Sequence, residues 1–307
     1  MRFMRPILAS VRLPGMDIVL GGALDATEVA QWRRALAAAG PEFRWHGFDE
    51  ARPIADRIRA AVVARPPAGA LQGLPALGVI QSLWAGVDSL LADRTLPEGV
   101  PIARMVDPMM NAAMAETALW ATLALQRHFF TYARQQAERR WQEWPQRRAG
   151  DWRVTVLGLG EMGLTTARRL VTMGYRVQGW ARRPRDLPDG VHGAFGADGL
   201  RGLLPRTDVL INLLPLTEAT RGLLAAPLFA ALPQGAGLVN LARGAHLVEA
   251  DLLDALASGQ IGHAVLDVFA TEPLPAAHAF WGHPRITVLP HAAAATDPDS
   301  AAAVAVA

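Results

Sequence analysis

Cysteine and lysine are both missing from this chain of 307 residues. Without cysteine the protein has no disulfide, no thiolate metal ligand and no cysteine nucleophile. This composition fits a cytoplasmic protein without requiring one, and we predict a cytoplasmic localisation. Without lysine there is neither a Schiff-base nucleophile nor a P-loop lysine, so arginine supplies all 30 basic side chains of the Lys and Arg total.

Long apolar runs and blocks of a single charge are missing as well. No apolar stretch approaches the about 20 residues that a membrane-spanning helix needs, and the opening MRFMRP lacks the apolar core of a signal peptide. The net charge is only +2, and no basic block is interleaved with aromatic residues. We therefore predict no membrane or nucleic-acid partner, and no metal site. A hydrophobic content of 51% supports a large core, and the length suits two domains.

The most informative segment is a glycine-rich turn between a predicted strand and a predicted helix. Val154–Leu157 are β-branched or aliphatic and lead directly into GLGEMG, which is a complete G-x-G-x-x-G motif. The first glycine permits a tight turn, the second lets the backbone approach a pyrophosphate, and the third allows close packing of helix and strand. Amides at the start of the helix then hold the phosphates. The predicted cofactor-binding residues of this turn are Gly158, Gly160, Glu161, Met162 and Gly163.

The end of the next predicted strand, at 175–180, indicates which dinucleotide binds. A site for NAD usually carries an acidic residue there, which holds the ribose 2′-hydroxyl. This chain has no acid at that point and has Arg182 and Arg183 instead, with Arg185 close behind. Because a guanidinium suits a 2′-phosphate, we predict NADP(H). The alternative is a solvated basic loop that also accepts NAD.

The remaining pattern alternates predicted strands and helices, which indicates an α/β fold with parallel sheets. Predicted strands lie at 16–20, 60–64, 77–83, 154–157, 175–180, 208–213, 236–240, 263–268 and 285–289. Predicted helices lie at 27–39, 112–127, 128–144, 164–173, 248–258 and 298–307. We expect the pair Trp141 and Trp144 to pack on the helix 128–144.

Three polar residues follow directly after predicted strands: Arg243, Glu272 and His291. Ligands of open parallel sheets bind beyond the carboxyl ends of the strands. A histidine can act as an acid near neutral pH, a carboxylate can orient it, and an arginine can bind a carboxylate and polarise a neighbouring carbonyl. With a reduced nicotinamide, such a set would reduce a 2-keto acid. Each of the three, taken alone, is more often a structural or surface residue.

Six segments, taken in order, resemble the D-2-hydroxyacid dehydrogenase family, and within it the glyoxylate/hydroxypyruvate reductase A type. They are SLWAGVD, VTVLGLGEMG, LINLLPLTEATRGLL, LVNLARGAHLVEADLLDAL, LDVFATEPLP and LPHAAAATDP, within the range 80–298. The resemblance implies two Rossmann-like domains, of which the smaller is flavodoxin-like. It implies a substrate domain at 16–104 with the fragment 292–307, and a dinucleotide-binding domain at 105–291.

The resemblance also implies roles for individual residues. The catalytic arginine, glutamate and acid–base histidine fall on Arg243, Glu272 and His291. The amides of Ala85 and Gly86 are implied to bind the substrate's carboxylate, and Trp84 either lines the substrate pocket or belongs to the core. The residues implied along the cofactor groove, with an aspartate against the nicotinamide amide, are Leu214, Pro215, Leu241, Ala242 and Asp267.

The implied activity is the NADPH-dependent reduction of glyoxylate and hydroxypyruvate, in a homodimer built on helices around 106–144. Two alternatives stay open: reduction of bulkier 2-keto acids such as phenylpyruvate, and a non-catalytic NADP-binding regulator. Many relatives carry a bulky residue near Ala64-Arg65, beside the substrate, so the substrate range is open. We expect 1–15 to be an extension, and we expect the final helix to be shorter than in relatives, which would weaken the closure of the domains.

Overall fold

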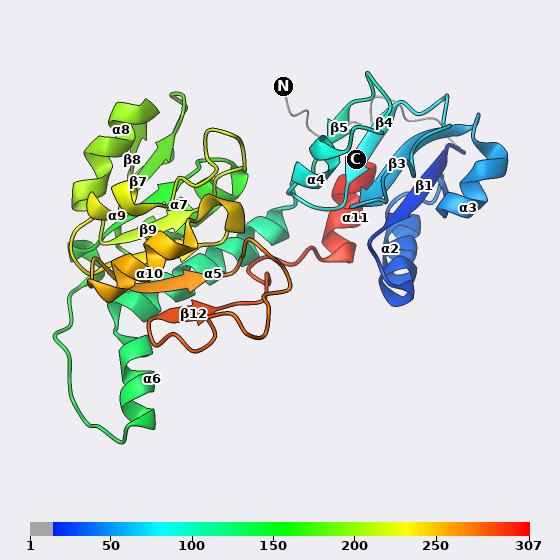
Figure 1. The fold of residues 1–307 in the computed structure, drawn as a ribbon. Helices are drawn as coiled ribbons and strands as arrows, with labels where there is room; N and C mark the ends of the chain where they lie inside the picture. The colour runs from blue at the N-terminus through cyan, green and yellow to red at the C-terminus, as the bar shows by residue number, and fades with distance from the viewer. Residues whose placement is uncertain (1–14) are drawn as a thin grey trace. The chain divides into compact units, whose positions relative to one another are not determined.

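The computed structural model describes residues 15–307, which divide into two compact units. One unit contains the described residues up to Met110 together with Thr296–Ala307, and the other contains Asn111–Ala295. Each unit has one parallel β-sheet (Figure 1). The predicted fold class of two parallel-sheet α/β domains is therefore confirmed. The predicted extension at 1–15 lies, apart from Gly15, outside the described residues.

The first unit has a five-stranded sheet in the order β2-β1-β3-β4-β5. Its strands are β1 (Asp17–Gly22), β2 (Arg44–His46), β3 (Ile58–Ala64), β4 (Val79–Ser82) and β5 (Ile102–Ala103). Its helices are α2 (Ala26–Ala39), α3 (Phe48–Ala51), α4 (Asp88–Ala92) and α11 (Pro298–Val306), with the 3₁₀ turn η1 (Arg52–Ile54). Small side chains let α11 pack closely on α2, because Ala301, Ala302 and Ala305 are all fully buried.

A buried carboxylate at the start of β1 joins three strands or their flanks. Asp17 accepts both Nε and Nη2 of Arg44, at 2.7 and 2.8 Å, and also Nη2 of Arg57 at 2.9 Å. Nε2 of His46 lies 2.8 Å from the same carboxylate. The bidentate hydrogen bonds of Arg44 hold the pKa of Asp17 well below its ordinary value of 3.8, against the opposing effect of burial. This cluster lies at the amino end of the sheet, opposite the carboxyl ends of its strands.

The second unit has a seven-stranded sheet in the order β12-β11-β10-β9-β6-β7-β8. Its strands are β6 (Arg153–Leu157), β7 (Arg176–Ala181), β8 (Val191–Phe195), β9 (Val209–Asn212), β10 (Ala236–Asn240), β11 (Ile261–Leu266) and β12 (Ile286–Val288). Its helices are α6 (Phe129–Ala137), α7 (Glu161–Thr172), α8 (Gly196–Leu203), α9 (Ala226–Ala230) and α10 (Glu249–Ala257), with 3₁₀ turns η2 (Ala149–Asp151), η3 (Leu204–Arg206) and η4 (Gly244–His246). The helix α5 (Pro108–Gln126) belongs mostly to this unit.

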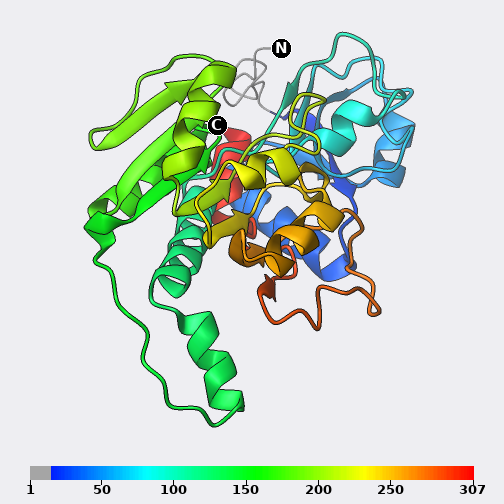
Figure 2. The same cartoon turned by 60° about the vertical axis from the view of Figure 1, so that its left-hand side comes forward.

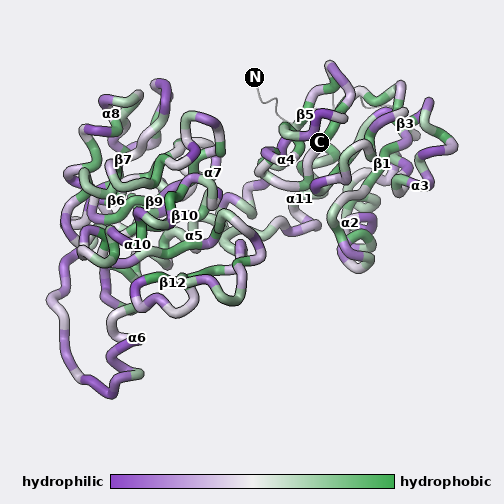
Figure 3. Tube along the Cα trace, viewed as in Figure 1, coloured by the Kyte–Doolittle hydropathy of each residue, from purple (hydrophilic) through white to green (hydrophobic). Residues whose placement is uncertain are grey.

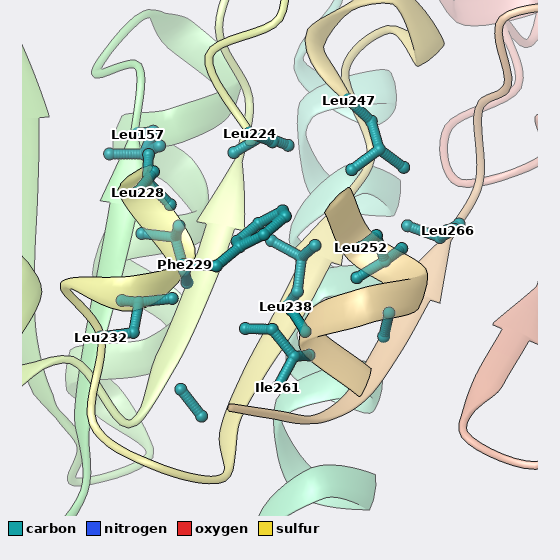
Figure 4. Close-up of a cluster of buried hydrophobic side chains, with 14 of the residues drawn as sticks. Leu157, Leu224, Leu228, Phe229, Leu232, Leu238, Leu247, Leu252, Ile261 and Leu266 are labelled. Atoms are coloured by element: carbon teal, nitrogen blue, oxygen red, sulfur yellow. The ribbon is translucent and has the colours of Figure 1, made fainter. Parts of the chain in front are cut away.

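The core of the second unit lies on both faces of its sheet. Under α9 and α10 it centres on Phe229, which is 1% exposed and packs among leucines from β9, β10 and both helices (Figure 4). On the other face, valines and isoleucines of the central strands pack against α5 and α7. Burying this many apolar side chains is the main stabilising contribution to the unit. The sheet is therefore a rigid base for residues that follow its strands.

The prediction of one helix from His128 to Trp144 was wrong. Helix α6 ends at Ala137, and residues 141–148 contain neither helix nor strand. His128 and Arg139 have φ of 57° and 55°, in the left-handed region that interrupts an α-helix on both sides of α6. Trp141 is 95% exposed, so it does not pack on a helix of its own chain.

We refer to residues 129–148 as the arm. The arm extends away from the rest of its unit (Figures 1 and 2), and its last part is largely hydrophilic (Figure 3). Hydrogen bonds hold the C-terminal part of the arm. The Tyr132 hydroxyl of α6 accepts the Trp144 amide at 3.1 Å, and Gln126 of α5 donates to the Arg147 carbonyl at 2.8 Å. Among residues 15–307, no helix is both long enough and apolar enough to cross a bilayer.

Candidate active site

Residues predicted to bind a dinucleotide lie at the carboxyl end of β6, which has strands on both sides. Gly158 has φ of 94°, and a Cβ there would stand 2.7 Å from the Leu213 carbonyl oxygen. A Cβ on Gly163 would stand 1.8 Å from the Gly158 carbonyl oxygen, so the third glycine lets α7 pack against the turn. At Gly160, by contrast, a Cβ would meet nothing within 4 Å.

This difference among the three glycines fits the binding of a pyrophosphate. Two of them are required by the turn itself, and Gly160 borders open space into which a phosphate can come. Helix α7 begins at Glu161, earlier than predicted, so the amides of Glu161, Met162 and Gly163 form its first turn. First-turn amides have no partner within the helix and are free to donate to an anion. The residues present therefore fit the dinucleotide.

The arginines that follow β7 are fully available for a ligand. Arg182, Arg183 and Arg185 are all exposed, and within residues 15–307 no carboxylate pairs with any of them. The strand end itself is fixed, because the Trp180 indole donates to the Gly196 carbonyl at 2.8 Å. Glycine at 179 also leaves room for Leu159, since a Cβ there would stand 2.5 Å from that side chain. A rigid strand end thus presents guanidinium groups to solvent.

His291 and Glu272 form a hydrogen-bonded pair, as the sequence predicts for an acid–base histidine. Nδ1 of His291 lies 2.7 Å from Oε2 of Glu272, and the other oxygen of Glu272 accepts the Phe269 amide at 2.9 Å. The Phe269 amide therefore orients the Glu272 carboxylate, and the carboxylate fixes the His291 ring with Nδ1 protonated. Nε2 has no partner among the described residues, and the imidazole is 48% exposed. His291 itself has φ of 56°.

Asp267 holds this left-handed turn in place. Its carbonyl oxygen accepts the His291 amide at 2.9 Å, and its carboxylate accepts the amides of Ala292 and Ala293 at 2.7 and 3.1 Å. The side chain is 1% exposed, and burial raises its pKa although the two amides and the positive charge of His291 oppose the shift. Its predicted contact with a nicotinamide amide stays a prediction.

The loop that carries Arg243 touches the loop that carries Glu272. A Cβ on Gly244 would stand 1.9 Å from the carbonyl carbon of Phe269 and 2.4 Å from the amide of Ala270. Only glycine fits there, because the two backbones are in direct contact. The guanidinium of Arg243 donates to the Ala242 carbonyl at 2.6 Å. Since β10, β11 and β12 are neighbours in the sheet, the residues after them, Arg243, Glu272 and His291, share one edge.

Sequence reasoning missed a buried polar network behind these loops. Asn212 Nδ2 donates to Asn240 Oδ1 at 2.9 Å and lies 3.0 Å from Nδ1 of His246. Asn240 Nδ2 donates to the Arg243 carbonyl at 3.1 Å, and Asn212 Oδ1 accepts the Leu214 amide at 3.2 Å. The network therefore ties the arginine loop to the predicted cofactor groove. The available signal was an asparagine ending two apolar strands, in LIN and LVN.

The other residues predicted along the cofactor groove differ in burial. Leu214, Leu241 and Ala242 are buried, so their backbones rather than their side chains are available to a cofactor, whereas Pro215 is exposed. Among residues 15–307, no group of three or more His, Asp and Glu side chains is placed to hold a metal ion.

The substrate-binding residues predicted in the first unit follow β4. Ser82 Oγ donates to the Trp84 carbonyl at 2.9 Å and accepts the Trp84 amide at 3.1 Å, which shapes the turn that continues into Ala85 and Gly86. Trp84 is partly exposed and so is not a core residue. The guanidinium carbon of Arg65 lies over the Trp84 ring, 5.2 Å from its centroid. The predicted role of Trp84 as a wall of the substrate pocket stays a prediction.

Comparisons with known proteins identify the family of this chain. The profile described as "D-isomer specific 2-hydroxyacid dehydrogenase, NAD binding domain" matches residues 119–293. A glyoxylate/hydroxypyruvate reductase A from Serratia proteamaculans is 44% identical over 246 residues, which is 78% of this chain and 78% of the relative.

Two solved structures extend the similarity over almost the whole chain. A D-isomer specific 2-hydroxyacid dehydrogenase from Xanthobacter autotrophicus, in complex with NADPH and MES, has a TM-score of 0.89 at 38% identity and covers 94% of this chain and 92% of its own. An NADPH-dependent glyoxylate/hydroxypyruvate reductase from Sinorhizobium meliloti, in complex with NADP and sulfate, has a TM-score of 0.84 at 35% identity, with 92% and 90% covered. The chain therefore belongs to the D-isomer specific 2-hydroxyacid dehydrogenase family.

Proposed function

We propose that the protein reduces glyoxylate to glycolate and hydroxypyruvate to D-glycerate with NADPH. Membership of the family supports the reaction class, and the relatives named above support these two substrates. The exposed arginines after β7, with no acid at that strand end, support NADPH over NADH. The observation that carries the proposal is the hydrogen bond of 2.7 Å between His291 and Glu272 at the ligand-binding edge of the sheet.

His291 is the proposed general acid. NADPH held at the β6 turn would supply the hydride for C2 of the keto acid. As the keto oxygen gains electrons, Nε2 of His291 delivers a proton to it, and the hydroxyl of the product forms. Glu272 orients the imidazole and leaves Nε2 available for the substrate, because it binds Nδ1 and is itself held by the Phe269 amide. The proton is replaced from solvent, to which the half-exposed ring has access.

The remaining proposed roles concern binding. Arg243 forms charge-assisted hydrogen bonds to the substrate's carboxylate and keto oxygen, which stabilise the negative charge that grows on the oxygen. The amides of Ala85 and Gly86 bind the carboxylate, and Trp84 forms a wall beside it. The first-turn amides of α7 bind the pyrophosphate. We assign the five-stranded unit as the substrate domain and the seven-stranded unit as the dinucleotide-binding domain.

Replacement of the histidine tests the proposal. We expect His291→Ala to lower kcat for glyoxylate by ~10²–10⁴-fold, since a positioned acid contributes about that much, while the KM for NADPH changes little. His278→Ala is the matched control, because His278 also lies beside a carboxylate, 3.2 Å from Glu249, in the same unit. The measurement is NADPH oxidation followed by absorbance.

The same assay separates the alternatives. A panel with phenylpyruvate distinguishes small from bulky 2-keto acids, and a higher kcat/KM for phenylpyruvate would overturn the substrate assignment. A protein that binds NADPH, but does not oxidise it with any keto acid of the panel, would be a regulator. Equal turnover of the His291→Ala variant and the wild type would overturn the assignment of the acid.

We further propose that the protein is a cytoplasmic homodimer whose interface is built on α5 and the arm. Large apolar side chains gather there in exposed positions: Trp120, Phe129 and Trp144 are 43%, 54% and 41% exposed, and Trp141 almost completely so. Apolar groups of this size on one region of the surface are typical of an interface between proteins.

A further inference from the structure

Arg65 occupies a strained backbone position at the ligand-binding edge of the first unit. It follows β3 directly and precedes Pro66-Pro67, and its φ is 44°. Four described residues other than glycine have a positive φ, and His291 is another of them. A side chain at such a φ is strained, so the conformation persists only where the surroundings hold it, and such positions cluster at functional sites.

The side chain of Arg65 lies against the aromatic ring of Trp84. In the parallel register Val63 pairs with Ser82, so Arg65 and Trp84 emerge at the same level from neighbouring strands. The guanidinium carbon lies 5.2 Å from the ring centroid, which is cation–π geometry. The stacked face of the guanidinium is occupied by the ring, and its N–H groups lie in the plane of the fork, where they remain able to donate.

The charge of Arg65 is not used by the fold. The side chain is exposed, and no carboxylate in residues 15–307 forms an ion pair with it. It is held over the residue that immediately precedes Ala85 and Gly86, whose amides are the proposed binders of the substrate's carboxylate. A cation stacked on Trp84 thus lies beside the proposed anion-binding turn, and its charge is not paired with a carboxylate of the described residues.

We propose that Arg65 is a specificity-determining residue that binds a second carboxylate on the substrate, so that the enzyme also reduces 2-keto diacids. The inference rests on the proposed function, since the first carboxylate occupies the Ala85–Gly86 turn. The chemistry at C2 is unchanged: hydride is added at carbon and a proton at oxygen. Arg65 touches only the far end of the acid, and Trp84 orients its guanidinium.

Matched pairs of substrates and variants test this proposal. The substrates are three keto diacids of increasing length, ketomalonate, oxaloacetate and 2-oxoglutarate, with 2-oxobutyrate and 2-oxopentanoate as partners that lack the second charge, and glyoxylate as reference. We expect Arg65→Gln to lower kcat/KM for the best diacid by about tenfold or more, because a hydrogen bond to a charged group is lost. For glyoxylate and the monoacids, the change should stay within about twofold.

Two further variants provide the controls. Arg34→Gln removes an exposed arginine of the same unit from helix α2, and it should leave every substrate unchanged. Arg65→Lys keeps the charge without the fork, and it should retain a preference for the diacid between those of wild type and Arg65→Gln. Circular dichroism confirms that each variant is folded. With wild type, higher ionic strength should lower kcat/KM more steeply for the diacid than for the monoacid of equal length.

The outcomes distinguish failure of the proposed role of Arg65 from failure of the proposed reductase function. A wild type that reduces glyoxylate but discriminates against every diacid would overturn the role of Arg65 and leave the proposed function standing. Equal losses for diacids and monoacids in Arg65→Gln would also overturn it, since they would indicate a general effect on folding or closure. A wild type that reduces no keto acid at all would overturn the proposed function, and the inference with it.

Discussion

At the scale of single residues, the glycine turn after β6 shows how one motif combines two different requirements. Gly158 and Gly163 are needed by the fold, because a Cβ on either would collide with backbone atoms at 2.7 or 1.8 Å. Gly160 is needed by the ligand, because its missing side chain leaves open space. The letters of the motif do not distinguish these roles, and the structure does.

This distinction predicts opposite effects for two similar substitutions. Gly160→Ala should leave the melting temperature within about 2 °C of wild type and raise the Kd for NADPH about tenfold or more, since the methyl group fills the space for a phosphate. Gly163→Ala should destabilise the protein by several kcal/mol, of the order seen for overpacking in cores. Calorimetry and fluorescence titration with NADPH measure the two quantities. Loss of stability in Gly160→Ala would contradict this account.

A second prediction at this scale concerns acid stability and His263. Its ring stacks on Phe130 with centroids 4.2 Å apart, and Nε2 lies 2.9 Å from Thr287 Oγ1. Burial, helped by the positive charges of Arg134, His283 and Arg285, lowers the pKa of His263 from 6.5 to about 3. The unfolded chain therefore binds a proton between these two values that the folded chain does not, and stability falls as pH drops below about 6.5.

Replacement of His263 by glutamine should remove this part of the pH dependence. The variant keeps a hydrogen-bonding group near Thr287 but has nothing to protonate. We expect it to be less stable than wild type at pH 7.5 and to lose less stability between pH 7.5 and pH 5, as measured by urea unfolding. His192→Gln, at an exposed position of β8, is the control and should follow the wild type. Parallel curves for His263→Gln and wild type would contradict the prediction.

At the scale of elements, different strand ends of the second unit carry different parts of the proposed site. The turns after β6 and β7 carry the proposed dinucleotide-binding residues, and the turns after β10, β11 and β12 carry the proposed reacting side chains. This division follows from the parallel sheet, because all its carboxyl ends lie along one edge. The loop after β7 can therefore change cofactor preference without moving His291.

The double substitution of Arg182 and Arg183 by alanine tests this independence. We expect kcat/KM for NADPH to fall about 10–100-fold, since charge-assisted hydrogen bonds to the 2′-phosphate are lost, with little change for NADH. Arg206→Ala, which removes another exposed arginine of the same unit, is the control. Equal effects on both cofactors would show that these arginines do not read the 2′-phosphate.

The sequence predicted most strands, because runs such as Val154–Leu157 consist of β-branched and aliphatic residues and are buried between helices. It missed β8, an edge strand in which His192 and Gly193 are exposed, so that no apolar pattern marks it. It predicted the pairing of His291 with Glu272. It did not predict the contact between Gly244 and Phe269, because that contact joins loops from different strands and depends on how the backbones meet.

At the scale of the whole molecule, packing within a single chain does not account for the exposed aromatic side chains of the arm. It exposes Trp141 almost completely, in a segment with no helix or strand. We expect Trp141→Ser to weaken the proposed homodimer by about 2 kcal/mol or more, which is about 30-fold in its dissociation constant, because exposed tryptophans at interfaces often dominate binding. Sedimentation velocity over a range of concentrations measures it.

The control for this prediction is Trp281→Ser, because Trp281 is 54% exposed but lies outside the arm and α5. It should leave the oligomeric state unchanged. A wild type that sediments as a monomer at all concentrations would overturn the proposed homodimer. Identical dissociation constants for Trp141→Ser and wild type would place the interface elsewhere.

The backbone contact between Gly244 and Phe269 constrains how this enzyme can be diversified in the laboratory. An insertion or deletion in either loop would shift the other, so Arg243 and Glu272 would lose their alignment together. Libraries that vary loop length there should yield almost no active clones. Arg65 and Trp84 interact through their side chains, so libraries that vary these two residues are the better starting point for changing which acid is reduced.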